Sequence, residues 1–404
     1  MHVLKIIQFY FPFQECGGPV AMVPELALAL AHRGHKVTVL TADLGLGAHP
    51  EVMVEPFEWG WRAYQENVQV IYLPTLWRYH ALTLNSHLLE FCRTFLRQVD
   101  MVHCYGLYDL LGPAASFFCR RQGIPYLIEP MGMSRPIDRS VRLKRLWHCS
   151  LGNRHWRDAT LIVATSELEQ RELLEDGVPP ERVVLRYVGI GSDVSRPSLS
   201  RGRFRSKWGI PPHEPLILFL GRLIPRKGAD LLIEVFAQAC PEAGWLVIAG
   251  PEGEAGYCAR LQKLALGCVG NGRVVFTGPV YDEEKLALLR DADLFILPSR
   301  YENFAIAAAE AMACDVPVIL SENCGICSLV NERAGLVVPL NKEALSGALH
   351  RMLSDTPLYT RFKKGCREVL KQLSWEQLAR EMEGHYNQAL VRSERFSIVL
   401  HSIN

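Results

Sequence analysis

The stretch PLILFLGRLIPRKGADLLIEVF (215–236) decides the fold. Its first half is a short apolar run that ends at Gly221, and its second half, from about Ala229, has the apolar spacing of a helix. A near-continuous apolar strand is buried on both faces, which is typical of a parallel sheet covered by helices. A strand, a polar loop and a helix in this order therefore predict one repeating unit of an α/β sheet.

The same alternation of apolar runs and helical patterns extends along the whole chain. The runs lie at 3–9, 36–41, 68–73, 100–103, 125–129, 159–164, 182–186, 215–221, 245–250, 273–277, 292–297, 316–320 and 335–339. They predict two Rossmann-like α/β domains, each a parallel sheet flanked by helices.

The domain boundary is expected near the middle of the chain. The segment 192–215 is rich in Pro, Ser, Gly and Arg without apolar periodicity, so it is predicted to be a linker. The expected domains are 1–195 and 196–373. A final helix is expected to begin after Ser374, to run to about Arg392 and to pack, with residues 374–404, on the first domain.

Composition excludes several classes of protein. The 404 residues include 44 Lys+Arg and 43 Asp+Glu, so the net charge of +1 gives no global reason to bind nucleic acid. No apolar run reaches the roughly 20 residues of a membrane-spanning helix. The first residues predict a strand without a cleavage signal, and the 12 scattered cysteines fit reduced thiols. These features predict a cytoplasmic protein.

The segment RYENFAIAAAEAMACDVPVI (300–319) directly follows an apolar run and carries two carboxylates, Glu302 and Glu310. In a helix, eight steps of about 1.5 Å separate them by roughly 12 Å, close to the reach from the sugar to the ribose of a sugar nucleotide. Carboxylates accept hydrogen bonds from hydroxyls, and a helix N-terminus between them would bind a diphosphate. The alternative is an ordinary amphipathic helix with exposed acidic residues.

Two loops that follow strands have the residues of an anion site. Arg222 and Lys227 follow the strand of 215–221, where two cations can grip a diphosphate, although a solvated basic loop is the alternative. In QECGGPVAM (14–22), Gly17 and Gly18 would let backbone N–H groups approach a ligand, or form only a tight turn. Neither loop has the glycine spacing of a Walker or dinucleotide motif.

Together these segments resemble the family 4 glycosyltransferases, retaining sugar-nucleotide enzymes with two facing Rossmann-like domains (the GT-B fold). The resemblance implies that Arg222 and Lys227 bind the donor diphosphate and that Glu302 holds hydroxyls of the donor sugar. It further implies that Glu310 binds the ribose. The remaining positions that it implies in donor binding are Asn303 and Phe304, through their backbone, and Gly17 and Gly18, on the opposite wall of the cleft.

The chain departs from the family pattern at positions near the reacting sugar. The usual His-x-His is His103 and Tyr105 here, so the sugar contact falls to one of these two, or His103 is structural. The usual Asn-Gly-Val-Asp is VGIG (188–191), and Ala305 replaces a common glycine. Base recognition in this family is largely by backbone and stacking, and Tyr281 is a candidate for it.

The resemblance implies transfer of a hexose-type sugar from a nucleoside diphosphate (UDP or GDP) to a hydroxyl acceptor, in polysaccharide or glycolipid synthesis. The 196–373 domain would hold the donor and the 1–195 domain the acceptor. No cofactor or metal is expected, because the chain has no Asp-x-Asp at a strand end and the lone pair Cys324 and Cys327 cannot supply four ligands.

Two other classes of protein stay open. A nicotinamide-dependent dehydrogenase also has Rossmann-like domains, but the chain lacks its three spaced glycines. A degenerate transferase or sugar-binding protein without turnover would fit the missing second histidine. Retention of the four charged residues Arg222, Lys227, Glu302 and Glu310 argues against loss of donor binding.

The segment 134–157 is strongly basic in a nearly neutral chain. It has seven Lys and Arg residues against one Asp, and Trp147 and Trp156 lie among them. Basic residues with aromatic ones suit an anionic membrane surface or a lipid-linked acceptor, so peripheral contact with the inner membrane face is expected. The alternatives are a solvated helix face and a site for a soluble anionic acceptor.

Overall fold

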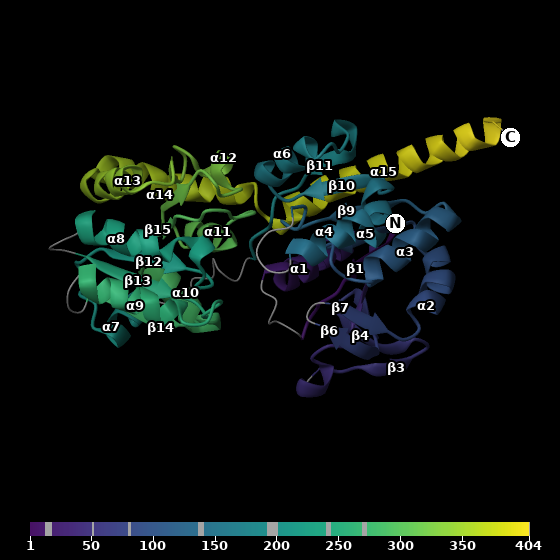
Figure 1. Ribbon diagram of the computed structural model, residues 1–404, viewed down its shortest axis with the longest axis horizontal. Coiled ribbons are helices and arrows are strands. Elements are labelled where there is room, and N and C mark those ends of the chain that lie inside the picture. The colour runs from purple at the N-terminus through teal and green to yellow at the C-terminus, as the bar shows by residue number, and fades with distance from the viewer. Residues whose placement is uncertain are drawn as a thin grey trace. The chain divides into compact units, whose positions relative to one another are not determined.

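The structure, a computed structural model, describes residues 1–12, 18–50, 52–79, 82–135, 141–191, 201–239, 244–268 and 273–403. Its internal contacts form two compact units, one of residues 1–189 with 375–404 and the other of residues 190–374. Each unit is built on its own sheet, and Figure 1 shows the helices that flank the two sheets.

Unit 1 contains a nine-stranded sheet in the order β11-β10-β9-β8-β1-β2-β5-β4-β3. Its strands are β1 (His2–Ile7), β2 (Lys36–Ala42), β3 (Glu55–Phe57), β4 (Gly60–Gln65), β5 (Val68–Leu73), β8 (Met101–Tyr105), β9 (Tyr126–Glu129), β10 (Leu161–Ala164) and β11 (Val183–Leu185). The seven strands predicted in this half pair in parallel. The antiparallel strands β3 and β4 and the hairpin β6 (Thr75–Tyr79) and β7 (Leu82–Asn85) were not predicted, because their apolar residues form no continuous run.

Helices cover both faces of this sheet. They are α1 (Gly18–His32), α2 (Leu88–Thr94), α3 (Leu111–Gln122), α4 (Val141–Cys149), α5 (Leu151–Arg157), α6 (Glu167–Glu175) and α15 (Trp375–Ile403). The C-terminal helix α15 packs against α1, and its residues Ala379, Met382 and Tyr386 belong to the same buried core cluster as Leu26. The helix continues well beyond Arg392, where the sequence pattern was expected to end.

Unit 2 contains a six-stranded sheet in which every pairing is parallel, in the order β14-β13-β12-β15-β16-β17. The strands are β12 (Leu216–Leu220), β13 (Trp245–Ala249), β14 (Val274–Gly278), β15 (Leu294–Leu297), β16 (Val318–Ser321) and β17 (Gly335–Val338). The strand order reverses between β12 and β15. In open α/β sheets, ligands bind outside the carboxyl ends of the two strands at such a reversal.

The helices of unit 2 complete its core. They are α7 (Arg203–Trp208), α8 (Ala229–Ala239), α9 (Tyr257–Cys268), α10 (Asp282–Asp291), α11 (Ile306–Ala313), α12 (Cys327–Val330), α13 (Lys342–Ser354) and α14 (Thr356–Lys371). Helix α7 lies inside the segment predicted to be a linker, so that prediction is wrong for residues 203–208. Phe204 and Arg205 of this helix are buried, and α7 packs against α10.

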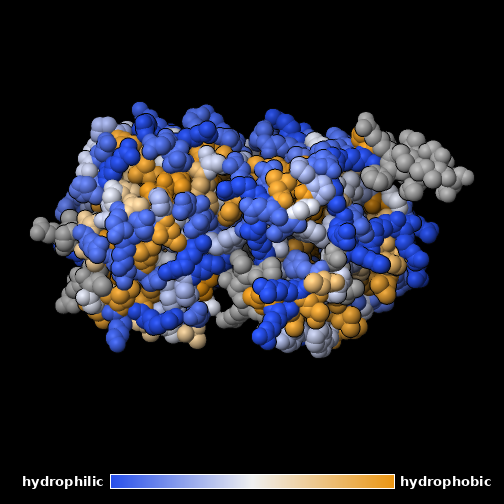
Figure 2. Space-filling view, turned by 45° about the horizontal axis from the view of Figure 1, so that its top comes forward, coloured by the Kyte–Doolittle hydropathy of each residue, from blue (hydrophilic) through white to orange (hydrophobic). Residues whose placement is uncertain are grey.

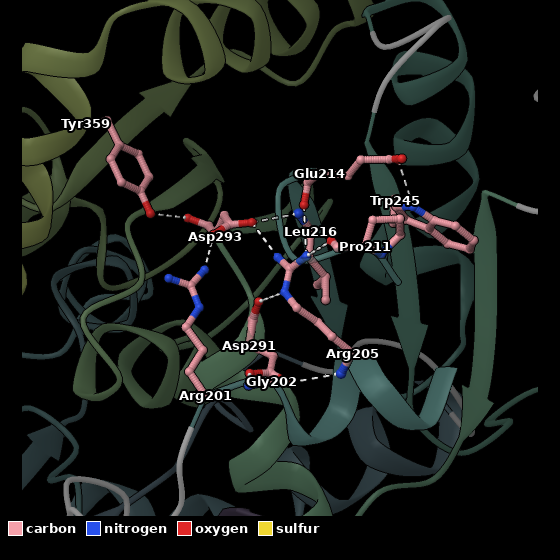
Figure 3. A network of polar contacts seen from close by, with 10 residues as sticks. All are labelled: Arg201, Gly202, Arg205, Pro211, Glu214, Leu216, Trp245, Asp291, Asp293 and Tyr359. Atoms are coloured by element: carbon pink, nitrogen blue, oxygen red, sulfur yellow. Dashed lines mark hydrogen bonds and ion pairs between the residues drawn. The ribbon is translucent and has the colours of Figure 1, made fainter. Parts of the chain in front are cut away.

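Arg205 explains why a basic, Pro-flanked segment folds into the unit (Figure 3). Its guanidinium is almost fully buried and donates to the carbonyl oxygens of Asp291 (3.1 Å) and Pro211 (2.8 Å) and to the Asp293 carboxylate (2.6 Å). The Asp293 carboxylate also accepts from the backbone N–H of Leu216 (2.8 Å). A buried charge is tolerated only when it is paired and hydrogen-bonded, so this network joins α7 to the starts of β12 and β15.

Hydrophilic side chains cover most of the face seen in Figure 2, with apolar residues showing between them in both units. Large apolar side chains are exposed on the β6–β7 hairpin, at Leu76, Trp77 and Tyr79, and on α4, at Leu143 and Leu146. Among the described residues, no helix is both long enough and apolar enough to cross a membrane.

Candidate functional site

The loops that follow β12 and β15 meet at the strand reversal of unit 2. The loop after β12 ends in a short 3-10 turn, Pro225–Lys227, and then in Gly228 with φ of +74°. A Cβ atom at Gly228 would lie 2.0 Å from the carbonyl oxygen of Pro298, so only glycine allows this turn to approach the end of β15. The close approach brings Lys227 to the residues that follow β15.

Lys227 and Glu302 form an ion pair between Nζ and Oε2, with side chains only 15% and 16% exposed. The backbone holds Glu302 on both sides, since its N–H donates to the carbonyl of Asn323 (3.0 Å) and its carbonyl accepts from Gly325 (2.9 Å). Glu302 therefore lies in a loop rather than in a helix. The separation of Glu302 from Glu310 was predicted from the rise of one continuous helix. That estimate does not apply, because α11 begins only at Ile306.

Helix α11 begins directly after Asn303, Phe304 and Ala305. Phe304 and Ala305 are buried, and Ala305, at the N-cap position, has no polar side chain to cap the helix. Uncapped N–H groups and the positive end of the helix dipole attract an anion. The helix packs on β15 and β16 through small residues, which places this N-terminus at the reversal beside the Lys227–Glu302 pair.

Glu310 is the only charged residue of α11, and its side chain is 16% exposed. Lys285 of α10 contacts it, with Nζ 2.6 Å from Oε1. The two carboxylates singled out from the sequence are thus each paired with a lysine of another element. Lys227 was predicted from its place after a strand, whereas Lys285 was not, because its place in a helical pattern gives no sign of this contact.

Two other predicted residues of unit 2, Arg222 and Tyr281, have exposed side chains. Arg222 is exposed in the loop after β12, which is held by a hydrogen bond from Leu223 to the Pro251 carbonyl (2.9 Å). Tyr281 is 67% exposed and forms the N-cap position of α10. Both side chains are available to a ligand at this edge of the sheet.

The described residues contain no group of three or more His, Cys, Asp and Glu side chains that could hold a metal. Cys324 and Cys327 lie close to Glu302, since Cys324 forms a β-bridge with it. The pKa of the Cys324 thiol is raised well above its usual range, mostly by a hydrogen bond with Cys327 and next by burial. An uncharged buried thiol is structural rather than reactive.

The side chains of His103 and Tyr105, which were predicted near the reacting sugar, are buried in unit 1. The Nδ1 atom of His103 is 3.0 Å from the hydroxyls of both Tyr105 and Tyr386, and Lys5 donates to the Tyr105 hydroxyl. Burial lowers the pKa of His103 and of Lys5 well below their usual values. Neither His103 nor Tyr105 is exposed to a ligand here, which favours the structural role left open for His103.

A buried ion pair adjoins this cluster. Arg186 donates to Glu129 at 2.5 Å, and both side chains are almost fully buried. Lys5 and Glu129 stand inside the apolar runs of β1 and β9, where a charged residue on a doubly buried strand signals a core network. This network was not predicted, although Lys5 and Glu129 could have revealed it. Of the two glycines predicted in this unit, Gly18 begins α1, and Gly17 lies outside the described residues.

Ala305 occupies the left-handed region, with φ of 80°, at the N-cap of α11. This conformation costs a non-glycine residue about 1–2 kcal/mol. We expect Ala305→Gly to raise the free energy of unfolding by about 0.5–1 kcal/mol, after the greater freedom of glycine in the unfolded chain is subtracted. Urea unfolding measures the change. The control is Ala308→Gly inside α11, which should lower the free energy of unfolding by about 1 kcal/mol. Equal losses of stability in both variants would contradict the claim that Ala305 is strained.

Family models cover most of the chain. The model described as "Glycosyl transferase 4-like domain" matches residues 17–189, and the one described as "Glycosyl transferases group 1" matches residues 200–369. Two Rossmann-like units that each match such a model define a glycosyltransferase of the GT-B fold. The chain belongs to family 4 of the retaining glycosyltransferases, the family that its motifs resemble.

Relatives and solved structures are similar to this protein over nearly the whole chain. The D-inositol 3-phosphate glycosyltransferase of Xylanimonas cellulosilytica is 26% identical over 94% of this chain and 93% of its own length. Mannosylfructose-phosphate synthase of Agrobacterium fabrum is 26% identical over 91% and 86%. Among solved structures, sucrose-phosphate synthase of Thermosynechococcus elongatus has a TM-score of 0.71 at 23% identity, over 97% and 99% of the two chains. Anabaena HepE in complex with UDP-glucose has a TM-score of 0.72 at 19% identity, over 96% and 100%. These structures share the GT-B fold with this chain.

Proposed function

We propose that unit 2 binds a nucleoside diphosphate hexose and that the enzyme transfers the hexose to a hydroxyl of an acceptor held by unit 1. The observation that carries this proposal is the Lys227–Glu302 pair at the strand reversal, beside the uncapped N-terminus of α11. Lys227, Arg222 and the helix N-terminus supply positive charge for the diphosphate. The Glu302 carboxylate accepts hydrogen bonds from hydroxyls of the sugar, and the Glu310 carboxylate accepts hydrogen bonds from hydroxyls of the ribose.

The proposed reaction retains the anomeric configuration by attack on the same face that the leaving group departs from. The bond between the anomeric carbon and the diphosphate oxygen breaks, the acceptor oxygen bonds to that carbon, and the acceptor proton passes to the diphosphate. Lys227, Arg222 and the N–H groups of α11 stabilise the charge that develops on the diphosphate. His103 and Tyr105 have no part in this proposal because both are buried.

Glu302→Ala and Glu310→Ala should differ in their kinetics. Glu310 would contact the ribose in both the ground state and the transition state, so its loss should mainly raise the donor KM. Glu302 would hold the sugar near the reacting carbon, so its loss should lower kcat as well. Steady-state kinetics over a range of donor concentrations separates the two effects, and the same change in both variants would count against these assignments.

A thermal-shift screen tests donor binding directly. The screen covers UDP-glucose, UDP-galactose, UDP-N-acetylglucosamine, GDP-mannose and NAD, and begins with UDP-glucose because HepE was solved with it. A ligand at 100 times its Kd stabilises a protein by about 2.7 kcal/mol. We expect stabilisation by one of the sugar nucleotides, in the presence of a chelator. Stabilisation by NAD alone would contradict the proposal, and binding without donor hydrolysis or transfer would favour a sugar-binding protein.

We further propose that unit 1 contacts an anionic membrane through α4, within the basic segment 134–157. Leu143 and Leu146 are 63% and 66% exposed, and Arg142 and Arg145 are exposed beside them. Residues three apart share one side of a helix, so two leucines and two arginines form adjacent rows. An apolar row beside a basic row suits a helix lying in the plane of a bilayer surface. Lys144 instead contacts the ring of Tyr108, at 5.3 Å.

Sedimentation with vesicles of phosphatidylglycerol and phosphatidylcholine tests this contact. The native protein should sediment at low salt, since each basic residue near the surface is worth up to about 1 kcal/mol. Arg142→Glu/Arg145→Glu and Leu143→Ser/Leu146→Ser should each lose this binding. The control is Arg361→Glu/Lys364→Glu on α14, which makes the same change in net charge. Equal sedimentation of all variants, or no sedimentation of the native protein, would contradict the membrane contact. A soluble acceptor would then be favoured.

A further inference from the structure

Lys285 is a charged residue beside the proposed donor site. It has no role in the proposed reaction. It lies on the first turn of α10, where its backbone N–H donates to the carbonyl of Tyr281 (3.1 Å). Its side chain is 32% exposed and extends to Glu310 of α11. The residue thus connects the start of α10, where Tyr281 lies exposed, to the carboxylate proposed to bind the ribose.

This ion pair differs from the other lysine contact of α10. Lys207 and Glu284 also form an ion pair, but their side chains are 60% and 41% exposed. Pairs that are so exposed contribute little, because water screens them. Glu310 is only 16% exposed on a helix that is otherwise made of alanine, isoleucine and methionine. A carboxylate in such surroundings needs a partner, and Lys285 provides it.

We infer that Lys285 is a positioning residue for the nucleoside of the donor, acting through Glu310. The ammonium holds Oε1 of Glu310 at 2.6 Å, so the carboxylate is fixed in one orientation before the ligand arrives. A carboxylate has more acceptor sites than one ammonium uses, and the remaining ones can receive ribose hydroxyls. A group held in advance binds more tightly, because less side-chain freedom is lost on binding. This inference rests on the proposed role of Glu310.

The alternative is that Lys285 only neutralises Glu310 and so stabilises the fold. The two roles differ in their dependence on the ribose hydroxyls. A positioning residue affects the binding of a nucleotide that has these hydroxyls and not of one that lacks them. A merely structural residue affects both nucleotides equally.

Calorimetric titration with UDP, GDP and their 2′,3′-dideoxy forms separates these roles. The full chain is measured as the native protein and as Lys285→Met, Lys285→Arg, Lys207→Met and Glu310→Gln. For whichever of UDP and GDP binds, Lys285→Met should weaken binding about fivefold to tenfold and leave the dideoxy form unaffected. Lys285→Arg, which keeps the ion pair, should retain most of the affinity. Lys207→Met is the matched control, because it removes a lysine of α7 that pairs with Glu284 of α10, and it should bind like the native protein.

Two results would overturn the inference about Lys285 alone. One is that Lys285→Met binds both nucleotide forms as the native protein does. The other is that it weakens both forms equally, while Glu310→Gln weakens only the form with hydroxyls. If Glu310→Gln weakens both forms equally, the ribose assignment of Glu310 fails, and the role of Lys285 fails with it. No binding of UDP or GDP by the native protein would overturn both proposals.

Discussion

Replacing Lys227 with alanine should lower kcat for sugar transfer by about 10²- to 10³-fold, the loss seen when one preorganised group that stabilises developing charge is removed. Lys227 is the largest expected contributor because Gly228 and the 3-10 turn fix it at the strand reversal, with a side chain only 15% exposed. A cation in a partly dry site stabilises the departing diphosphate far more than one in water. The variant also leaves Glu302 without its ion-pair partner, so its melting temperature must be measured alongside.

Two further variants make this result specific. Lys227→Arg keeps a positive charge and should recover part of the lost activity. Lys342→Ala removes a lysine that pairs with Glu234 at 2.9 Å, with side chains 46% and 34% exposed, in the same unit. Its activity should stay within about twofold of the native enzyme. Full activity in Lys227→Ala would show that Lys227 does not contribute to the proposed donor site.

Replacing Arg205 with methionine should lower the free energy of unfolding by about 3–5 kcal/mol, the loss typical of breaking a buried ion pair from one side. The substitution removes the buried one of the two guanidiniums that pair with Asp293, the other being that of Arg201, and it removes the Arg205 donor from the carbonyls of Pro211 and Glu214. Since the network anchors the starts of β12 and β15, donor binding should weaken with stability. Urea unfolding followed by tryptophan fluorescence measures the loss.

Arg203→Met is the matched control for Arg205→Met. Arg203 lies two residues earlier on α7 and pairs with Glu283 at 3.0 Å, with side chains 57% and 72% exposed. Its loss should change the free energy of unfolding by less than about 0.5 kcal/mol. Similar losses in the two variants would mean that burial of the Arg205 network does not determine the stability of unit 2.

The parallel strands were predictable because their burial on both faces leaves a continuous apolar run in the sequence. All 13 runs correspond to parallel strands of the two sheets. The order of the strands is a tertiary property and leaves no such local pattern. The antiparallel strands β3, β4, β6 and β7 were missed because each exposes one face or more, as Trp61 and Trp77 show, and so mixes polar and apolar residues.

The linker prediction failed for a similar reason. The segment around Arg205 has the composition of a linker, and nothing local shows that Asp291 and Asp293, more than 80 positions away, would bury its guanidinium. The contacts of His103 and Tyr105 are long-range as well. Their partners Lys5 and Tyr386 come from the two ends of the chain, so the sequence spacing of the two residues gave no sign of these contacts.

The candidate donor site was predictable in part. Lys227 and Glu302 follow two apolar runs, and residues after parallel strands gather at one edge of the sheet. Their contact depends on β12 and β15 being neighbours, which the sequence pattern does not state. Lys285 lies in the ordinary helical pattern that follows β14, so only the packing of α10 on α11 reveals its contact with Glu310.

Donor hydrolysis without an acceptor is the most direct test of the central claim, that Lys227 and Glu302 belong to a site for a nucleoside diphosphate hexose. Proton NMR of the anomeric signals follows the donor that gives the largest thermal shift, in the presence of a chelator. We predict slow release of the nucleoside diphosphate by the native enzyme, with the sugar first appearing in the anomeric form of the donor. Lys227→Ala and Glu302→Ala should release at least tenfold less. Release that is equal in all three proteins, or release by none of them despite donor binding, would contradict the account.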